Sequence, residues 1–220
     1  RAAGILQRHG EMAGAAWAWN GRALALRQMG RYRQAQAAFA HVLDLARRTG
    51  DAMNEATALD NLGRLDLQLG DPGRAVARFG ESARIHRAHR QHREGLVPCI
   101  DRATALVMLG RHDEAETALD SVLTVCRDLG LRDLELLGEG QLIESWLARG
   151  RPGAAAARCR QLLAGGEPPS RLVATETRLR LARALADRDS VAAAITVLQR
   201  VQAHGAGAVG RSDRERLPQH

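Results

Sequence analysis

The chain has 220 residues, of which 45% are hydrophobic and only 3% are aromatic. Its common residues include Ala, Leu, Arg, Glu and Gln, which favour helices, so the composition predicts an all-α protein. Arg supplies all 32 basic residues against 25 acidic ones, and the two signs are mixed along the whole length. This mixing argues against the one-sided basic surface of a nucleic-acid-binding domain, and no apolar run reaches the ~18 residues of a membrane span.

A period of forty residues runs through the chain. Four glycines stand forty residues apart, each followed five residues later by Ala and nine residues later by an apolar residue. The glycines are Gly30, Gly70, Gly110 and Gly150, the alanines are Ala35, Ala75, Ala115 and Ala155, and the apolar residues are Phe39, Phe79, Leu119 and Cys159. A second set of glycines, Gly10, Gly50 and Gly130, marks another turn of the same unit. The sequence is therefore a repeat array.

Each repeat predicts a hairpin of two antiparallel helices. Between residues 58 and 69, Ala and Leu recur at three- and four-residue spacing, which is helical periodicity. Gly70 is expected to end that helix in the left-handed conformation, and Pro72 to begin the next, with Pro152 doing the same later. The small residues Gly63, Ala75 and Ala103 are expected where two helices approach closely.

In chain order, residues 1–9 are predicted to form the second helix of a truncated unit. The repeat units follow at about 12–50, 52–92, 96–130, 133–165 and 170–202, the last with Asp187 or its neighbours in place of the turn glycine. Residues 203–220 lose the apolar periodicity, so we expect a flexible tail. Because the chain begins at Arg1, we also expect it to be a piece of a longer protein.

The motif of a small residue, a turn glycine, Ala five residues later and an apolar residue four residues after that resembles the tetratricopeptide repeat (TPR). Tyr32 also matches, and "WNGRALALRQMGRYRQAQAAFAHVL" is the nearest copy. The forty-residue period exceeds the usual ~34 residues, which implies longer helices. The resemblance implies a right-handed superhelical solenoid of antiparallel helix hairpins over residues 1–202.

Long units with text such as "LARRTGDAMNEATALDNLG" also resemble the C-terminal repeats of large actinobacterial regulators, namely SARP-type regulators and signal-transducing NTPases. That resemblance implies a non-enzymatic sensing or docking module of a cytoplasmic transcription regulator. The partner would be a protein or peptide, or another domain of the same regulator.

Function in stacked hairpins usually lies on the concave surface formed by the first helix of each unit. Transferring the TPR pattern predicts a partner-binding groove there, in which amides would bond a peptide backbone and Arg a carboxylate. The candidates are Trp17, Asn20, Leu24, Arg27, Gln28, Asp60, Asn61, Arg64, Gln68, Asp101, Thr104, Met108, Gln141 and Glu144. Of these, Asn20, Asn61 and Arg64 are the strongest, although Asp60 stands where a carboxylate clamp would favour Lys.

Two aromatic residues near the start of the array receive different interpretations. Trp19 lies on the apolar stripe and is predicted to be in the core, as is Trp146. Trp17 lies off the stripe, so it is either an exposed binding anchor or packs on the truncated upstream unit.

The stretch "RIHRAHRQHREG", residues 84–95, interleaves histidines with arginines. A shift of forty places it at the end of a second helix and the following turn, with Arg90 where glycine usually stands. We interpret it as an ordinary helix end, because basic side chains suit that position. A metal site at His86 and His89, and a contact with an anionic partner, are the open alternatives.

The cysteines, Cys99, Cys126 and Cys159, are odd in number and far apart, which argues against a disulfide framework or a zinc site. This is typical of the cytoplasm, and each Cys is interpreted as a small core residue. "LLGEGQL" around Gly138 and Gly140 is only a very weak phosphate loop, and nucleotide-binding and hydrolase motifs are missing, so neither an enzyme nor a cofactor is predicted.

Three other functions stay open on the sequence alone. Direct nucleic-acid binding would use Arg84 to Arg93, although aromatic stacking residues are almost absent. Self-assembly, including a homodimer, would use apolar surface at a solenoid end. A small-molecule sensor would need an enclosed apolar pocket, which a sequence cannot show.

Overall fold

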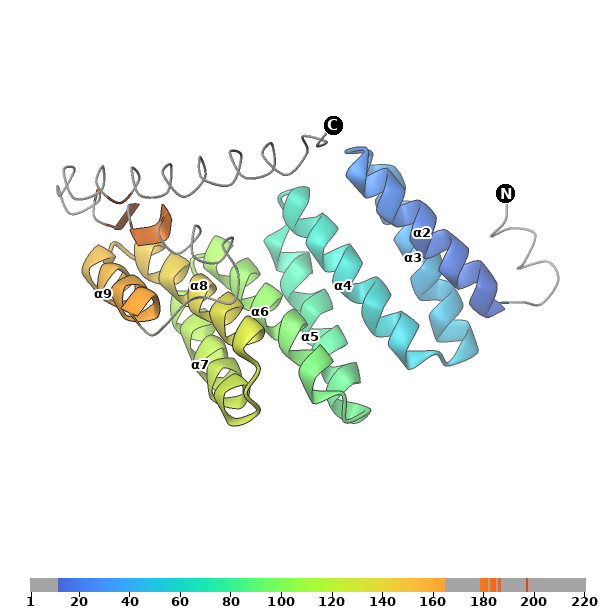
Figure 1. The fold of residues 1–220 in the computed structure, drawn as a ribbon. Helices are drawn as coiled ribbons and strands as arrows, with labels where there is room; N and C mark the ends of the chain where they lie inside the picture. Colours follow the sequence, from blue (N-terminus) through green and yellow to red (C-terminus); the bar gives the residue numbers. More distant parts are fainter. Residues whose placement is uncertain (1–11, 165–178, 182, 185, 187–196, 198–220) are drawn as a thin grey trace, which may run out of the picture. The chain divides into compact units, whose positions relative to one another are not determined.

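The structure is a computed structural model that describes residues 12–164, 179–181, 183, 184, 186 and 197. Eight helices of the described residues have defined bounds (Figure 1). They are α2 (Met12–Gln28), α3 (Tyr32–Thr49), α4 (Ala52–Gln68), α5 (Pro72–Ala88), α6 (His92–Met108), α7 (His112–Asp128), α8 (Arg132–Ala148) and α9 (Pro152–Ala164). Strands do not occur within this described part of the chain, so the predicted all-α class is confirmed.

Successive helices begin twenty residues apart, so two helices with their turns make up the forty-residue repeat. The predicted turn glycines adopt left-handed backbone angles, with φ of +71° at Gly30, +80° at Gly70 and +68° at Gly150. Glycine carries no Cβ to oppose this conformation, which explains why the period is so visible in the sequence. Pro72 and Pro152 are the first residues of α5 and α9, as predicted.

The turn between α5 and α6 departs from the glycine rule. Arg90 adopts a φ of +58° and is the one non-glycine residue with positive φ among the described residues. The helix α6 begins at His92, four residues before the expected unit boundary at 96. Sequence reasoning placed this start too late because the turn carries neither Gly nor a side-chain cap: Gln91 precedes the helix without capping it.

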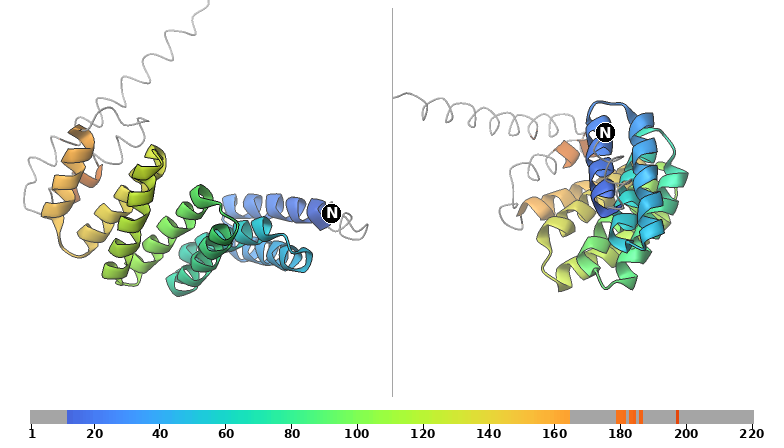
Figure 2. Two further views of the ribbon diagram at one scale, coloured as in Figure 1. Left: turned by 90° about the horizontal axis from the view of Figure 1, so that it is seen from below. Right: turned by 90° about the vertical axis from the view of Figure 1, so that its right-hand side faces the viewer.

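The chain divides into two compact units, residues 1–125 and 126–220. In the first unit, consecutive helices from α2 to α6 pack side by side, and α4 also contacts α2 and α6 (Figures 1 and 2). The repeated residues Phe39 and Phe79 are fully buried in its core, as are Ala75 and Ala103. A Cβ added to Gly63 would lie 2.8 Å from the Phe79 ring, so the predicted close approach of α4 and α5 is confirmed.

In the second unit, α8 packs against α9. Its core joins Ile143 and Leu147 of α8 to the Ala155, Ala156 and Cys159 cluster of α9, with Leu181 and Ala184 from the next segment. Trp146 is half-buried against this core. The helix predicted for residues 1–9, most of the fifth unit and the tail at 203–220 lie outside the described residues.

Candidate functional site

The predicted groove residues lie on α2, α4, α6 and α8, which are the first helices of the four hairpins. We call the surface formed by Asn20 of α2, Asp60, Asn61 and Arg64 of α4, and Asp101 of α6 the first-helix face. All five residues belong to the first compact unit. Their environments differ, and the differences determine what the face can bind.

Asn20 and Asp60 occupy the same repeat position, forty residues apart, on neighbouring helices. The Oδ1 atom of each is buried and accepts no hydrogen bond from any described residue. Burial raises the pKa of Asp60 to about 6; the Ser82 hydroxyl and the Arg64 guanidinium lower it, and Asp101 raises it further. A buried acceptor without a donor costs about 1–3 kcal/mol, so both side chains gain from an incoming N–H group.

Arg64, in contrast, already has a carboxylate partner. Its Nε donates to Asp101 Oδ2 at 2.9 Å, and its Nη2 lies 2.8 Å from the same oxygen. This ion pair joins α4 to α6, so Arg64 links two repeats. A carboxylate clamp built on Arg64 would have to displace Asp101.

The other candidates on these helices fall into three environments. Asn61 is buried, with 7% of its surface exposed, and the Thr104 hydroxyl donates to the Ile100 carbonyl within α6. Leu24 and Arg27 are half-buried, and Gln28, Gln68 and Met108 are exposed. Trp17 is 80% exposed, whereas Trp19 is half-buried and meets His41 edge-on, with 4.7 Å between the ring centroids.

In the second unit, the candidate Glu144 is also paired. Its carboxylate accepts hydrogen bonds from Arg180 at 3.1 Å and from Arg183 at 2.9 Å. Glu144 stands at the repeat position of Arg64, eighty residues on, with the opposite charge. In both of these repeats, the residue at that position forms an ion pair to the following repeat. Gln141, one helical turn earlier, is half-buried.

Sequence reasoning missed two fully covered acids. Asp66 is 1% exposed; it accepts a hydrogen bond from Gln36 at 3.1 Å and pairs with Arg78 at 3.1 Å. It ties α3, α4 and α5 together. The forty-residue alignment holds the signal, because Asp66 stands in the column of Leu26 and Leu106, which are both core residues.

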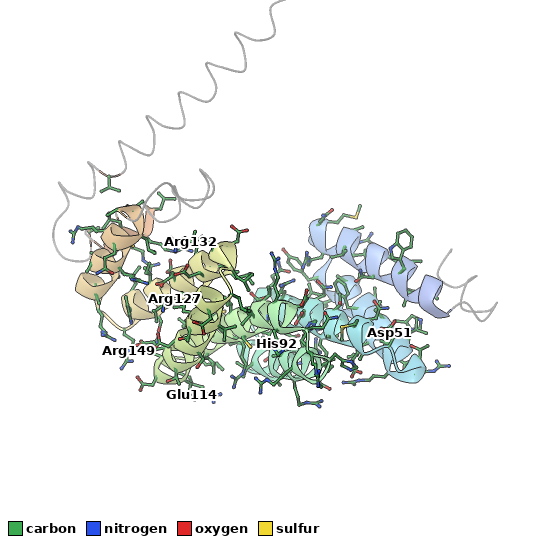
Figure 3. The ribbon with its side chains drawn as sticks, turned by 60° about the horizontal axis from the view of Figure 1, so that its bottom comes forward. Asp51, His92, Glu114, Arg127, Arg132 and Arg149 are labelled. Carbon is green, nitrogen blue, oxygen red and sulfur yellow. The ribbon has the colours of Figure 1, made fainter. Side chains whose placement is uncertain are left out.

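The second missed acid is Glu139, which is 0% exposed. It accepts hydrogen bonds from Arg127 at 2.9 Å and from Arg158 of α9. Arg127 also pairs with Glu135, as does Arg132 beside it (Figure 3). Glu139 shares its repeat column with Leu59, a core residue, so an acid there also marks a network.

Two histidines of residues 84–95 lie in different environments. His86 is buried where α5 meets α6, and its Cβ would lie 3.1 Å from a Cβ added to Gly95. Burial lowers its pKa. His89 follows the end of α5 and is exposed. The described residues contain no group of three or more His, Cys, Asp or Glu side chains that could hold a metal ion.

Two further expectations are resolved by the structure. Cys126 and Cys159 are buried core residues, as predicted, but Cys99 is only half-buried and lines a pocket, because the second helices α5 and α7 do not fully cover this part of α6. The stretch around Gly138 and Gly140 lies within the helix α8, and a Cβ at Gly140 would lie 3.0 Å from the Arg180 guanidinium. These glycines are packing residues.

Comparison with known proteins shows which family part of the chain resembles. Residues 14–88 match the sequence model of the tetratricopeptide repeat family. No curated protein matches the chain.

Several solved structures share the fold. TPR-like repeats of a putative kinesin light chain from Podosopora anserina align with a TM-score of 0.70 and 18% identity, over 87% of this chain and 95% of that one. NprR in complex with its cognate peptide NprX aligns with a TM-score of 0.68 and 14% identity, over 90% of this chain and 58% of that one.

A signal transduction ATPase with numerous domains (STAND) from Pyrococcus horikoshii, described as having a tetratricopeptide repeat sensor, aligns with a TM-score of 0.73 and 12% identity. The match covers 97% of this chain and 33% of that one. At these identities the likeness shows the fold. Residues 14–88 are therefore similar to tetratricopeptide repeats, and the fold of the solved repeat structures extends beyond them.

Proposed function

We propose that this chain is a non-enzymatic protein- or peptide-interaction module that binds its partner on the first-helix face. The observation that carries the proposal is the pair of buried acceptors, Asn20 Oδ1 and Asp60 Oδ1, which receive no hydrogen bond from the described residues. They occupy one repeat position on adjacent helices. A partner that places one N–H donor against each of these two oxygens would satisfy both acceptors.

The chemistry of the face favours a donor-rich segment over a free carboxylate. Arg64 is neutralised by Asp101, which leaves Asp60 as the charged group without an ion-pair partner on this face. At neutral pH, a Lys or Arg side chain would stabilise the ionised form of Asp60, and backbone amides would bond Asn20. We therefore propose an extended peptide segment that carries at least one basic residue.

The proposal extends to the larger protein in which this module would act. We propose that the module acts as the sensor of a cytoplasmic regulator of transcription, bound by a peptide, a protein or another domain of that regulator. NprR, solved with a peptide, and the STAND protein with a repeat sensor support this role by fold likeness. None of the described helices is long and apolar enough to cross a membrane.

The test is selection from a random peptide library displayed on phage, followed by affinity measurement of the enriched peptides. The double variant Asn20→Ala/Asp60→Ala removes both acceptors. The matched control Gln34→Ala/Asp44→Ala removes one amide and one carboxylate from exposed positions of α3. We expect basic peptides to be enriched and to lose at least tenfold in affinity for the first variant only. Enriched peptides that bind both variants equally well would refute the proposal that the first-helix face is the binding site.

A second candidate function is nucleic-acid binding. Arg84, Arg87, Arg90 and Arg93 are exposed and make no ion pair with any residue that the structure describes. This function predicts an affinity for duplex DNA that falls steeply between 50 and 200 mM salt, by about 10³-fold or more if six or more phosphates are contacted. Fluorescence anisotropy with a random duplex measures this, and a shallow salt dependence would exclude it.

A further inference from the structure

A pocket of about 320 Å³ opens in the first compact unit between α5, α6 and α7. Its volume falls in the lower part of the range of small-molecule sites. Its walls come from two second helices, α5 and α7, with the first helix α6 between them, so its lining shares no residue with the first-helix face.

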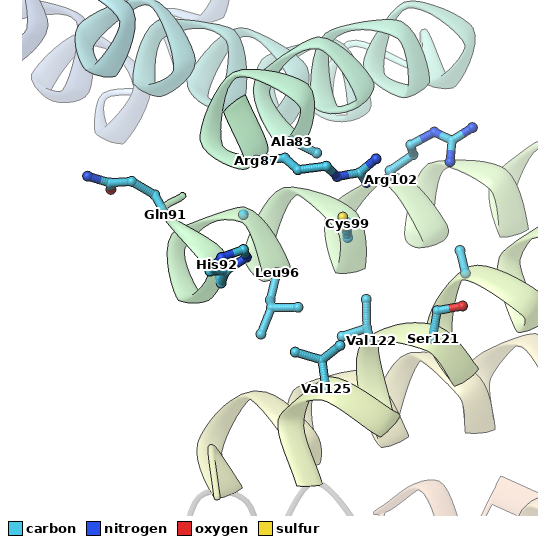
Figure 4. A pocket seen from close by; sticks show the side chains of 12 residues that line it. Ala83, Arg87, Gln91, His92, Leu96, Cys99, Arg102, Ser121, Val122 and Val125 are labelled. Carbon is cyan, nitrogen blue, oxygen red and sulfur yellow. The ribbon is translucent and has the colours of Figure 1, made fainter. Parts of the chain in front are cut away.

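The walls of the pocket are chemically different (Figure 4). Arg87 of α5 and Arg102 of α6 lie along one side, and Val122 and Val125 of α7 lie on the opposite side, with Leu96 and Cys99 of α6 between them. A molecule in the pocket would therefore meet cations on one flank and hydrocarbon on the other.

An acid near the cationic flank already has another partner: Glu114 pairs with Arg111, and its pKa is lowered mainly by Arg111 and less by Arg102. None of the twelve lining residues is acidic, and neither Arg87 nor Arg102 forms an ion pair with a described residue. Other arginines of the unit, such as Arg47 and Arg111, are paired with glutamates. Arg102 packs against α5 at Gly80, where an added Cβ would lie 3.8 Å from its Nε.

We propose that this pocket binds a small anionic amphiphile: one carboxylate on a short apolar body. The carboxylate pairs with the guanidinium groups of Arg87 and Arg102, which can each donate two parallel hydrogen bonds. The apolar body covers Leu96, Val122 and Val125 and removes their surface from water. The two interactions require each other, because neither a bare carboxylate nor a neutral chain fills both flanks.

Cys99 provides a reporter for occupancy. Its thiol lies in the pocket, whereas Cys126 and Cys159 are fully buried. Burial raises the pKa of the Cys99 thiol, although Arg87 and Arg102 lower it. Cys99 is therefore expected to react slowly with iodoacetamide, and a bound molecule would slow the reaction further by covering the sulfur.

The experiment uses octanoate as the probe and the full chain as the protein. Calorimetry compares octanoate with acetate, which lacks the apolar body, and with 1-octanol, which lacks the charge. We expect octanoate to bind at least tenfold more tightly than either. Saturating octanoate is expected to slow alkylation of Cys99 at least fivefold, with mass spectrometry locating the modified residue.

Variants assign the binding to the pocket. Arg87→Gln/Arg102→Gln is expected to lose at least tenfold in octanoate affinity and the protection of Cys99. The control Arg84→Gln/Arg93→Gln removes the same charge from exposed positions outside the lining and is expected to bind normally. Val125→Asp, at an exposed position on the apolar wall, tests the other flank by repelling the carboxylate.

Circular dichroism confirms that each variant is folded before binding is measured. Equal affinity for octanoate and octanol, an unchanged Cys99 rate, or equal binding by the two double arginine variants would each overturn the proposal. Because no variant touches Asn20 or Asp60, failure here leaves the peptide-binding test unaffected.

Discussion

Asp60 makes the stability of the first unit depend on pH. Its pKa is about 6 in the folded chain against an ordinary value of 3.8, so between these values the folded state holds the proton more tightly. The free energy of unfolding therefore falls as pH rises from about 4 to about 6, and the loss is complete above that window.

Asp60→Asn is accordingly expected to stabilise the protein at pH 7 by about 1–2 kcal/mol and to have little effect at pH 4, after allowance for partial exposure. Urea unfolding at both pH values measures this difference. A variant that gains nothing at pH 7 would show that Asp60 is not destabilised when ionised.

Gly63 is another residue whose neighbours decide its effect. Gly63→Ala would place a methyl group 2.8 Å from the fully buried Phe79 ring. The resulting strain, about 1–3 kcal/mol, exceeds the ~1 kcal/mol that Ala gains over Gly in a helix. We expect a lower thermal unfolding midpoint.

Gly73→Ala is the matched control for that experiment. Gly73 lies in the first turn of α5, is exposed, and an added Cβ would meet only Asp71 Oδ1 at 3.8 Å. The same change there is expected to raise the midpoint. If both variants were stabilised, the Phe79 ring would have moved away from the new methyl group without a measurable cost, which would contradict the expected strain at Gly63.

Helices α2 to α8 each end beside a residue with a left-handed backbone, which is a glycine except in the α5–α6 turn. Arg90 holds a left-handed conformation that opposes its Cβ by about 1 kcal/mol or more. Arg90→Gly is therefore expected to stabilise the protein by about 1 kcal/mol, measured by urea unfolding. Gly70→Ala, at a φ of +80°, is expected to destabilise by a similar amount. Equal and negligible effects would contradict this account of the turns.

Across the whole molecule, each compact unit contains its own buried acid, Asp66 in the first and Glu139 in the second. Stacked repeats contact mainly their neighbours, so damage is expected to stay local. Glu139→Ala removes the carboxylate that Arg127 and Arg158 share. Arg127 keeps Glu135 and both arginines are partly exposed, so we expect a cost of about 1.5–3 kcal/mol.

Hydrogen exchange of backbone amides measures where that cost falls. Glu139→Ala is expected to lower protection in α8 and α9 and to leave α3 and α4 unchanged, whereas Asp66→Ala is expected to do the reverse. Loss of protection throughout the chain in either variant would show that the two units unfold as one.

The sequence by itself determined the repeat, the helices and most of the turns. Gly70, Pro72 and the apolar stripe of α4 act through their own backbone or through neighbours within a helical turn, so their effects are visible in a short stretch of sequence. The contact of Gly63 with Phe79 was also predictable, because the forty-residue period places small residues where helices cross. The start of α6 was not, since Arg90 carries no local sign of its left-handed conformation.

The tertiary structure decided which polar side chains are free. Arg64 was predicted to bind a partner, yet its carboxylate partner is Asp101, 37 residues away on another helix. The walls of the pocket are also separated in sequence, because Cys99 of α6 and Val122 of α7 line it together although their positions are 23 residues apart. Such pairings depend on how helices pack side by side. The periodicity of one helix determines which face is buried, but only packing determines which side chain of the next helix lies opposite.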